Sequence, residues 1–230
     1  MTYNFCGIVI ADIEEYRAFL AACEQYSPVD SRLYSHDSCT FSCGGMKVRA
    51  VCCGIGKVNA AAAVAYLVAD GAVCIFNVGL SGGMSGVARG QLSAPDRFYE
   101  HDFDLTPMGY EMGYKPNQDN TYYADARLLE RLCEMYPFIR VGAAVTGDCF
   151  VCDDRLRARL NGRYAPMTCD METAAIASVC HDAGVPFLSV REVSDDAGDD
   201  ACESYRDKNS EQSTAAPDVL LGLMASLTDR

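Results

Sequence analysis

The stretch Met167-Thr-Cys-Asp170-Met171-Glu172-Thr-Ala-Ala-Ile-Ala-Ser-Val-Cys180 decides the fold, together with the apolar run Val185–Val190 and Arg191-Glu-Val-Ser194-Asp195-Asp196-Ala197 after it. The first residues predict a strand, the alanine-rich part from Glu172 predicts a helix, and Val185–Val190 predicts a second strand. This succession is typical of an α/β protein. Acids stand next to both strands, and ligands of α/β sheets bind outside the strand ends, so the pattern indicates acid–base chemistry on a small molecule.

The same alternation of strands and helices runs through the rest of the chain. Further strands are predicted at Phe5–Ala11, Thr40–Cys43, Met46–Cys53, Val73–Val78, Leu92–Tyr99 and Arg140–Thr146. Helices are predicted at Ile13–Cys23, Lys57–Ala69, Ala124–Glu134, Asp154–Leu160 and Ser213–Leu227, and the second of these is apolar enough to be covered on most sides. We expect loops at Gly79–Gly83, His101–Asn120 and Asp195–Glu211. The pattern predicts a three-layer α/β sandwich with a parallel or mixed sheet, in one domain over residues 1–230.

Composition excludes several classes of partner. The formal net charge of −13 repels phosphate backbones and anionic membranes, so no nucleic acid or membrane partner is expected. The longest apolar stretch, Val58–Ala69, is about half the length that a bilayer requires. The first residues lack the pattern of a secretory signal, so we expect a cytoplasmic protein.

The 13 cysteines are read as reduced thiols, because their number is odd and many lie within apolar runs. The pair Cys149 and Cys152 has no second pair and no well-spaced histidine, so it does not match a zinc site, and a redox pair is the less favoured alternative. Gly54-Ile-Gly56-Lys57-Val58-Asn59 lacks the first glycine and the Ser/Thr of a phosphate-binding loop and reads as a tight strand-to-helix turn. No metal or other cofactor is expected.

Six motifs in order, across roughly residues 7–205, resemble the nucleoside phosphorylase and nucleosidase superfamily. They are Gly54–Ala60, Val78-Gly79 with Gly82-Gly83, His101-Asp-x-Asp104-x-Thr106 with Gly109-Tyr110-Glu111-x-Gly113, Gly147-Asp148-x-Phe150-Val151, Asp170-Met171-Glu172 and Ser194-Asp195-x-Ala197. The most similar branch is that of the 5'-methylthioadenosine/S-adenosylhomocysteine nucleosidases. The resemblance implies an α/β/α sandwich whose central mixed sheet is partly barrel-like, and a homodimer whose pocket is completed by residues 101–114 of the neighbouring subunit.

The resemblance also implies catalytic roles. Cleavage of an N-glycosidic bond leaves negative charge on the purine, and Asp195 resembles the acid that protonates the base at N7. Glu15 lies where similar enzymes carry the base that activates water on the opposite face of the sugar. Glu172 matches the acceptor of the ribose hydroxyls, Met171 the residue packed under the sugar, and Arg191 a group that orients Glu172.

The remaining expected substrate-binding residues surround the base and the 5' substituent. Phe150 is suited to stack on adenine while Val151 offers backbone groups to its polar edge, and Tyr205 resembles an aromatic wall for the 5' group. Ser81 and Gly82 complete the set. Each residue also has an ordinary structural interpretation: Glu15 and Glu172 as acids at helix starts, Asp195 as a turn cap.

Two departures from the family pattern affect the substrate more than the reaction. Leu80 replaces a serine that steadies the catalytic aspartate, so Asp195 could be held by Ser81 instead. Asp12 replaces an apolar residue, which favours a polar or cationic 5' group.

The leading hypothesis is hydrolysis of a purine nucleoside thioether to adenine and the thio-ribose. A phosphorylase of the same fold would need arginines near the glycine loop, which has none, and Glu15 would repel the phosphate. Hydrolysis of another N-riboside such as futalosine stays open, as does a non-catalytic nucleoside-binding protein. His101 is interpreted as a satisfied surface or interface histidine or as a base.

Overall fold

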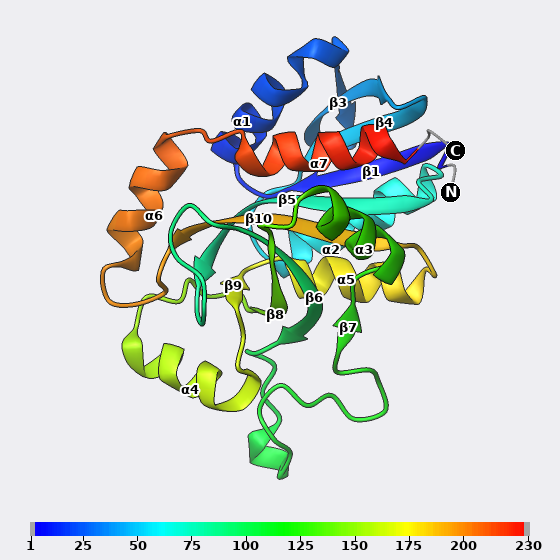
Figure 1. The fold of residues 1–230 in the computed structure, drawn as a ribbon. Coiled ribbons are helices and arrows are strands. Elements are labelled where there is room, and N and C mark those ends of the chain that lie inside the picture. Colours follow the sequence, from blue (N-terminus) through cyan, green and yellow to red (C-terminus); the bar gives the residue numbers. More distant parts are fainter. Residues whose placement is uncertain (1–2, 228–230) are drawn as a thin grey trace.

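The computed structural model describes residues 3–227, so both ends of the expected 1–230 domain lie outside the described residues (Figure 1). Its strands are β1 (Phe5–Ile10), β2 (Val29–Leu33), β3 (His36–Cys43), β4 (Met46–Cys52), β5 (Cys74–Gly83), β6 (Leu92–Glu100), β7 (Tyr122–Tyr123), β8 (Arg140–Thr146), β9 (Thr168–Asp170) and β10 (Phe187–Asp195). Its helices are α1 (Ile13–Cys23), α2 (Lys57–Ala69), α3 (Ala126–Met135), α4 (Asp154–Tyr164), α5 (Thr173–Asp182), α6 (Ala201–Ser210) and α7 (Ala215–Ser226). Two 3-10 turns occupy η1 (Glu24–Tyr26) and η2 (Thr106–Met108).

The strands form one mixed sheet that is partly closed into a barrel. The order is β10-β6-β8-β9-β5-β1-β4-β3-β2, and β10 also pairs with β5, which closes β5, β10, β6, β8 and β9 into a ring. β1 lies parallel to β4 and β5, whereas β5 pairs antiparallel with β9, and β10 antiparallel with β6. The prediction of a mixed, partly barrel-like sheet is confirmed.

Helices cover both faces of this sheet and bury two apolar cores. α1, α3 and α7 pack together over one face, whereas α2 and α5 pack against each other over the opposite face (Figure 1). The first core contains Phe19 of α1 and Leu220 of α7, and the second contains Leu67 of α2 and Ile176 of α5. The three-layer α/β/α sandwich is therefore confirmed.

Three sequence-based expectations about elements were wrong. Gly79–Gly83 is the end of strand β5 and not a loop, because Gly82 and Gly83 pair with β9 while β10 pairs along the other side. The Asp195–Glu211 segment contains helix α6, although only Ala201 and Lys208 of that helix are buried. α2 buries one face only, and Val58 is 79% exposed in this chain. Strand β7 has too few residues for a periodic signal, and β2 is mostly polar and exposed, so neither was predicted.

The structure adds two observations on cysteines and membranes. All thirteen cysteines are free thiols, and most of them are buried. No helix within residues 3–227 is long and apolar enough to cross a membrane.

Candidate active site

A single cavity is lined by all ten residues that the sequence singled out. Those residues are Glu15, Ser81, Gly82, Phe150, Val151, Met171, Glu172, Arg191, Asp195 and Tyr205. The cavity and its open mouth together hold about 640 Å³ of empty space. The acids lie within or next to strands rather than beyond a common strand edge, because β5 and β10 run on past the expected strand ends into the barrel.

Asp195 is the last residue of β10 and is 3% exposed. The backbone amide of Ala197 donates to its Oδ1 (2.8 Å), and the Ser194 hydroxyl lies 2.6 Å from its Oδ2. Burial raises the pKa of the Asp195 carboxyl, and these two hydrogen bonds offset part of the rise. The expectation that Ser81 holds this acid was wrong, because the neighbouring Ser194 does so. The Ser81 hydroxyl has no hydrogen-bond partner among residues 3–227.

Glu15 lies in the first turn of α1 with both oxygens bonded to backbone amides. The Leu80 amide donates to Oε1 (2.6 Å) and the Asp12 amide to Oε2 (3.2 Å), the latter as half of a capping box. Gly79 is required for this approach, since a Cβ at that position would lie 2.7 Å from Glu15 Oε1. Burial raises the pKa of Glu15, and the nearby charge of Arg191 opposes the rise. The helix-start interpretation is therefore correct but incomplete, because the same carboxylate faces the cavity.

Glu172 precedes α5 and is 4% exposed. The amide of Gly56 donates to its Oε1 (2.8 Å), which connects the Gly54–Ala60 motif to the site, and Gly56 has a φ of +100° that favours glycine. Arg191 Nη2 lies 3.8 Å from Glu172 Oε2, and Arg191 Nη1 donates to Asn77 Oδ1 (3.1 Å). Burial raises the pKa of Glu172 to about 7.

Two residues that organise the site were not among the site residues predicted from the sequence. Asp170 Oδ1 accepts hydrogen bonds from the amides of Glu172 (3.0 Å) and Thr173 (2.9 Å) and from the Thr146 hydroxyl (2.7 Å), which fixes the start of α5. Asn77 in β5 accepts from Arg191 and from Ser189 and donates to a β1 carbonyl. Asp170 three residues before an alanine-rich helix carried a capping signal, whereas nothing local to Asn77 indicated its partners.

Two aromatic rings meet at the cavity. The rings of Phe150 and Tyr205 lie 5.4 Å apart at 67°, an edge-to-face contact between the loop after β8 and helix α6. Phe150 is 38% exposed, whereas the neighbouring Val151 is 5% exposed. The sequence analysis assigns Phe150 to the adenine and Tyr205 to the 5' substituent, and in this structure the two rings contact each other.

His101 is neither a surface residue nor a satisfied one. It is 3% exposed, and its Nε2 has no hydrogen-bond partner among residues 3–227. Burial lowers its pKa, so the ring is neutral at physiological pH. It does not line the cavity, which argues against a catalytic base at this position.

The cavity is rich in carboxyl groups. Its lining includes five carboxylates, namely Asp12, Glu15, Asp170, Glu172 and Asp195, but Arg191 is the one Lys or Arg side chain among the described lining residues. Buried carboxyl groups with raised pKa values in one cleft are typical of acid–base catalysis. Within the described part of the chain, no group of three or more His, Cys, Asp and Glu side chains could hold a metal ion.

Comparisons with known proteins agree with this geometry. Residues 6–225 match the model of the Phosphorylase superfamily. The 5'-methylthioadenosine/S-adenosylhomocysteine nucleosidase of Halalkalibacterium halodurans is 30% identical over 228 residues, which cover 96% of each chain. The enzyme of the same name from an Exiguobacterium species is 33% identical over 207 residues, covering 86% of this chain and 88% of the relative.

Solved structures give the same result. The Streptococcus pneumoniae nucleosidase with the transition-state inhibitor MT-ImmA superposes with a TM-score of 0.88 and 27% identity, covering 97% of this chain and 99% of the other. A Helicobacter pylori nucleosidase has a TM-score of 0.91 at 20% identity, which supports the fold. The chain therefore belongs to the phosphorylase superfamily, and within it to the family of the 5'-methylthioadenosine/S-adenosylhomocysteine nucleosidases.

Proposed function

We propose that this chain hydrolyses the N-glycosidic bond of 5'-methylthioadenosine and S-adenosylhomocysteine and releases adenine and the thio-ribose. The observation that carries the proposal is the single cavity in which Asp195, Glu15 and Glu172 are buried together. Family membership supports the same reaction.

Asp195 is the general acid in this mechanism and protonates the departing purine at N7. The raised pKa of its carboxyl favours a protonated form that can donate. The Ser194 hydroxyl lies 3.1 Å from the Ser81 carbonyl as well as 2.6 Å from Asp195 Oδ2. Because that hydroxyl has one proton, it can donate to the carbonyl while accepting from protonated Asp195.

Glu15 is the general base that takes a proton from the attacking water. Its two backbone hydrogen bonds fix the carboxylate, and the absent side chain of Gly79 leaves room for this approach. Attack on the face opposite the departing base gives inversion at the anomeric carbon.

Glu172 accepts hydrogen bonds from the ribose hydroxyls, with Arg191 orienting it and Met171 packing beneath the sugar. A buried carboxylate next to the developing positive charge of the ribose also stabilises the transition state. Phe150 and Val151 bind the adenine, and Tyr205 contacts the 5' substituent. Ser81 and Gly82 complete the binding surface; a Cβ on Gly82 would lie 3.1 Å from Asp195 Oδ1.

Water is favoured over phosphate as the nucleophile. A phosphorylase needs cationic side chains that converge on the phosphate, but Arg191 is the one Lys or Arg among the described residues that line this cavity. Arg191 already contacts Asn77 and Glu172. The carboxylate of Glu15 would in addition repel an anion at the same position.

The test incubates purified protein with methylthioadenosine, S-adenosylhomocysteine, futalosine, adenosine and inosine, each with and without phosphate. We expect adenine and a free thio-ribose from the first two substrates, independent of phosphate. Sugar 1-phosphate would identify a phosphorylase, cleavage of futalosine alone would identify a different hydrolase, and binding without cleavage would identify a nucleoside-binding protein.

We also infer a cytoplasmic homodimer. Large apolar side chains are exposed at the start of α2, namely Ile55 (49% exposed) and Val58 (79%), and in the loop after β6, namely Met108 (70%). Lys57 connects these segments, since its Nζ lies 2.6 Å from Asp102 Oδ1. Large apolar side chains that stay exposed in a single chain favour burial against a second copy, and free thiols fit a reducing compartment. Light scattering should give twice the chain mass, and Val58→Asp should give monomers.

A further inference from the structure

Two segments that face each other near the cavity each carry a cysteine that the proposed reaction does not use. The loop after β8 contains Cys152, and the first turn of α6 contains Cys202. Two residues before Cys152, Phe150 contacts Tyr205 with ring centroids 5.4 Å apart. Two residues after Cys152, the Asp154 amide donates to Asp199 Oδ1 (3.3 Å). These contacts on either side place Cys152 opposite Cys202.

The Cys202 thiol is near enough to affect the ionisation of Cys152. The interaction with the Cys202 thiol is the largest cause of the raised pKa of Cys152. Cys202 is exposed and Cys152 is partly exposed, whereas most of the other cysteines are buried. Neither residue lines the cavity.

Helix α6 is attached to the rest of the protein mainly through polar contacts. Only Ala201 and Lys208 of the helix are buried. Lys208 Nζ lies 2.6 Å from Glu192 Oε1 in β10, and Asn209 donates to Asp12 Oδ1 (3.2 Å). Opening of this helix loses little hydrophobic stabilisation because so little apolar surface is buried, and Tyr205 on the helix lines the cavity. Phe150 and Tyr205 both line the cavity, so a movement of α6 that separates their rings would widen its mouth.

We propose that Cys152 and Cys202 form a reversible disulfide that locks α6 over the cavity and blocks turnover under oxidation by hydroperoxides. Only the effect on turnover depends on the proposed nucleosidase function; the site of modification does not.

The chemistry is a two-electron oxidation of the dithiol. The exposed Cys202 thiolate attacks the peroxide, so its sulfur becomes a sulfenic acid and hydroxide leaves. The Cys152 thiolate then attacks that sulfur, the S–S bond forms, and the sulfenic hydroxyl leaves as water after taking up a proton. In total two thiols and one hydrogen peroxide give one disulfide and two waters. A small-molecule dithiol reverses the reaction by thiol–disulfide exchange.

The test treats the full-length protein with hydrogen peroxide, alkylates the remaining thiols, and maps peptides without reduction. We expect a peptide pair joined through Cys152 and Cys202. Turnover of methylthioadenosine should fall by at least about tenfold, because a locked helix α6 can no longer open to admit substrate or release product. Dithiothreitol should restore it.

Matched variants separate this site from general oxidation. Cys152→Ser and Cys202→Ser should keep basal activity and lose the peroxide effect, whereas Cys133→Ser should respond like the unsubstituted protein. Cys133 is a partly exposed cysteine on α3, which lies away from α6 (Figure 1).

Absence of the joined peptide, after peroxide has oxidised other cysteines, would overturn the proposal. So would a joined peptide with unchanged turnover, or an equal loss of activity in Cys202→Ser. If the untreated protein cleaves no nucleoside, the proposed nucleosidase function is wrong but the disulfide proposal is not. In that case the rate at which bound nucleoside dissociates, measured before and after oxidation, tests whether the disulfide locks α6 over the cavity.

Discussion

The carboxyl groups in this cavity differ in their immediate surroundings, and these surroundings set their chemistry. Asp195 has a hydroxyl at one oxygen and a single amide at the other, so a proton on it can be accommodated. Glu15 accepts from two backbone amides, which favours the ionised form even as burial opposes it. Asp195 is therefore suited to donate a proton and Glu15 to accept one. An inverting hydrolysis requires this pair of roles.

Replacing the proposed acid tests this division. Asp195→Asn removes the donated proton but keeps an oxygen to accept from the Ala197 amide, so the fold should persist. We expect kcat to fall about 100- to 10,000-fold with nucleoside binding retained. Adenine release and calorimetric binding provide the measurements. The exposed neighbour gives the control: Asp196→Asn should be fully active, and full activity in both variants would remove Asp195 from the mechanism.

A parallel experiment applies to the proposed base. Glu15→Gln keeps one oxygen for the Leu80 amide but presents an amide nitrogen to the Asp12 N–H, so a small loss of stability accompanies the loss of hydrolysis. Nucleoside binding should remain. Glu14→Gln, one residue away and outside the cavity, should leave turnover unchanged. Equal turnover in the two variants would mean that Glu15 serves only as a helix cap.

Asp12 gives a prediction about specificity. Its Oδ1 accepts from the Glu14 amide (2.8 Å) and from Asn209, and it has no ion-pair partner among the described residues, although it lines the cavity. We expect it to favour a 5' substituent with an ammonium group. Asp12→Asn keeps the helix cap and removes the charge, so kcat/KM for S-adenosylhomocysteine relative to methylthioadenosine should fall a few-fold, since such a pair contributes about 1 kcal/mol or less. An unchanged ratio would assign Asp12 to capping alone.

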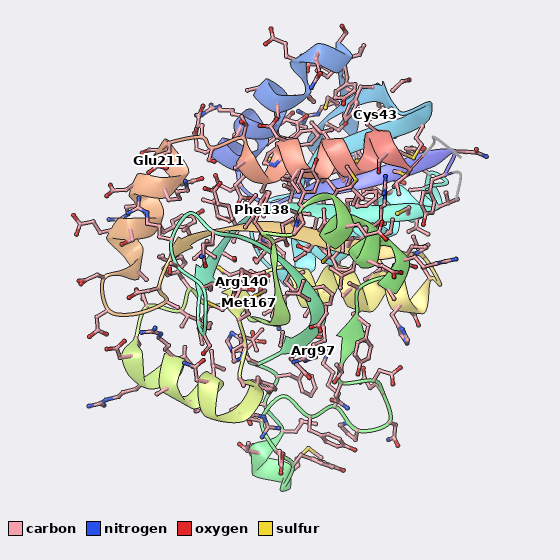
Figure 2. The ribbon with its side chains drawn as sticks, in the orientation of Figure 1. Cys43, Arg97, Phe138, Arg140, Met167 and Glu211 are labelled. Carbon is pink, nitrogen blue, oxygen red and sulfur yellow. The ribbon has the colours of Figure 1, made fainter. Side chains whose placement is uncertain are left out.

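At the scale of elements, α6 differs from the helices that cover the sheet. α1, α2, α5 and α7 each bury an apolar face, whereas α6 is held by charged and polar side chains. Glu211, labelled in Figure 2 where α6 leads toward α7, pairs with Lys208 (2.8 Å) and with Arg89 (3.3 Å). The position of Tyr205 therefore depends on ion pairs, of which the buried one between Lys208 and Glu192 is the most significant.

Breaking that buried pair should loosen the helix. Lys208→Met leaves Glu192, which is 4% exposed, without its counter-charge, so the free energy of unfolding should fall by on the order of 3 kcal/mol. KM should rise because Tyr205 is no longer held at the cavity. Arg89→Ala breaks only the exposed pair with Glu211 and should cost under about 1 kcal/mol. Urea unfolding and Michaelis kinetics distinguish them; equal effects would show that burial of the pair is unimportant.

At the scale of the whole molecule, the active site opposes stability at neutral pH. The folded state raises the pKa of Glu172 from about 4.5 to about 7, so the folded protein binds the proton more tightly than the unfolded chain does. Protonation of Glu172 therefore stabilises the folded state fully below pH 4.5, and this stabilisation is lost as the pH rises through about 7. Glu15 and Asp195 shift in the same direction.

Glu172→Gln isolates this effect. The variant lacks the titration, so its free energy of unfolding relative to the unsubstituted protein should increase between pH 4.5 and about 7. Urea unfolding at fixed protein concentration across that range measures the difference. A difference that stays constant with pH would show that Glu172 titrates alike in the folded and unfolded states.

Local patterns accounted for most elements. α1, α2 and β8 have the predicted bounds, because apolar spacing and the capping acids at α1 are properties of neighbouring residues. α6 was missed for the same reason, since its stability comes from distant partners such as Glu192 and Asp12 rather than from an apolar face. The candidate residues came largely from motif resemblance, and the structure brings all ten to one cavity, while their chemical roles stay predictions.

The sequence by itself determined the α/β alternation, the two apolar faces of the sheet and the set of acids near the strands, because these depend on residue type and spacing along the chain. The tertiary structure alone decided which groups surround each acid. The Gly56 amide reaches Glu172 from 116 positions away, and Gly79 admits Glu15 against the Leu80 amide. These contacts arise only when the chain folds, and no local pattern encodes a contact between segments so far apart in the chain.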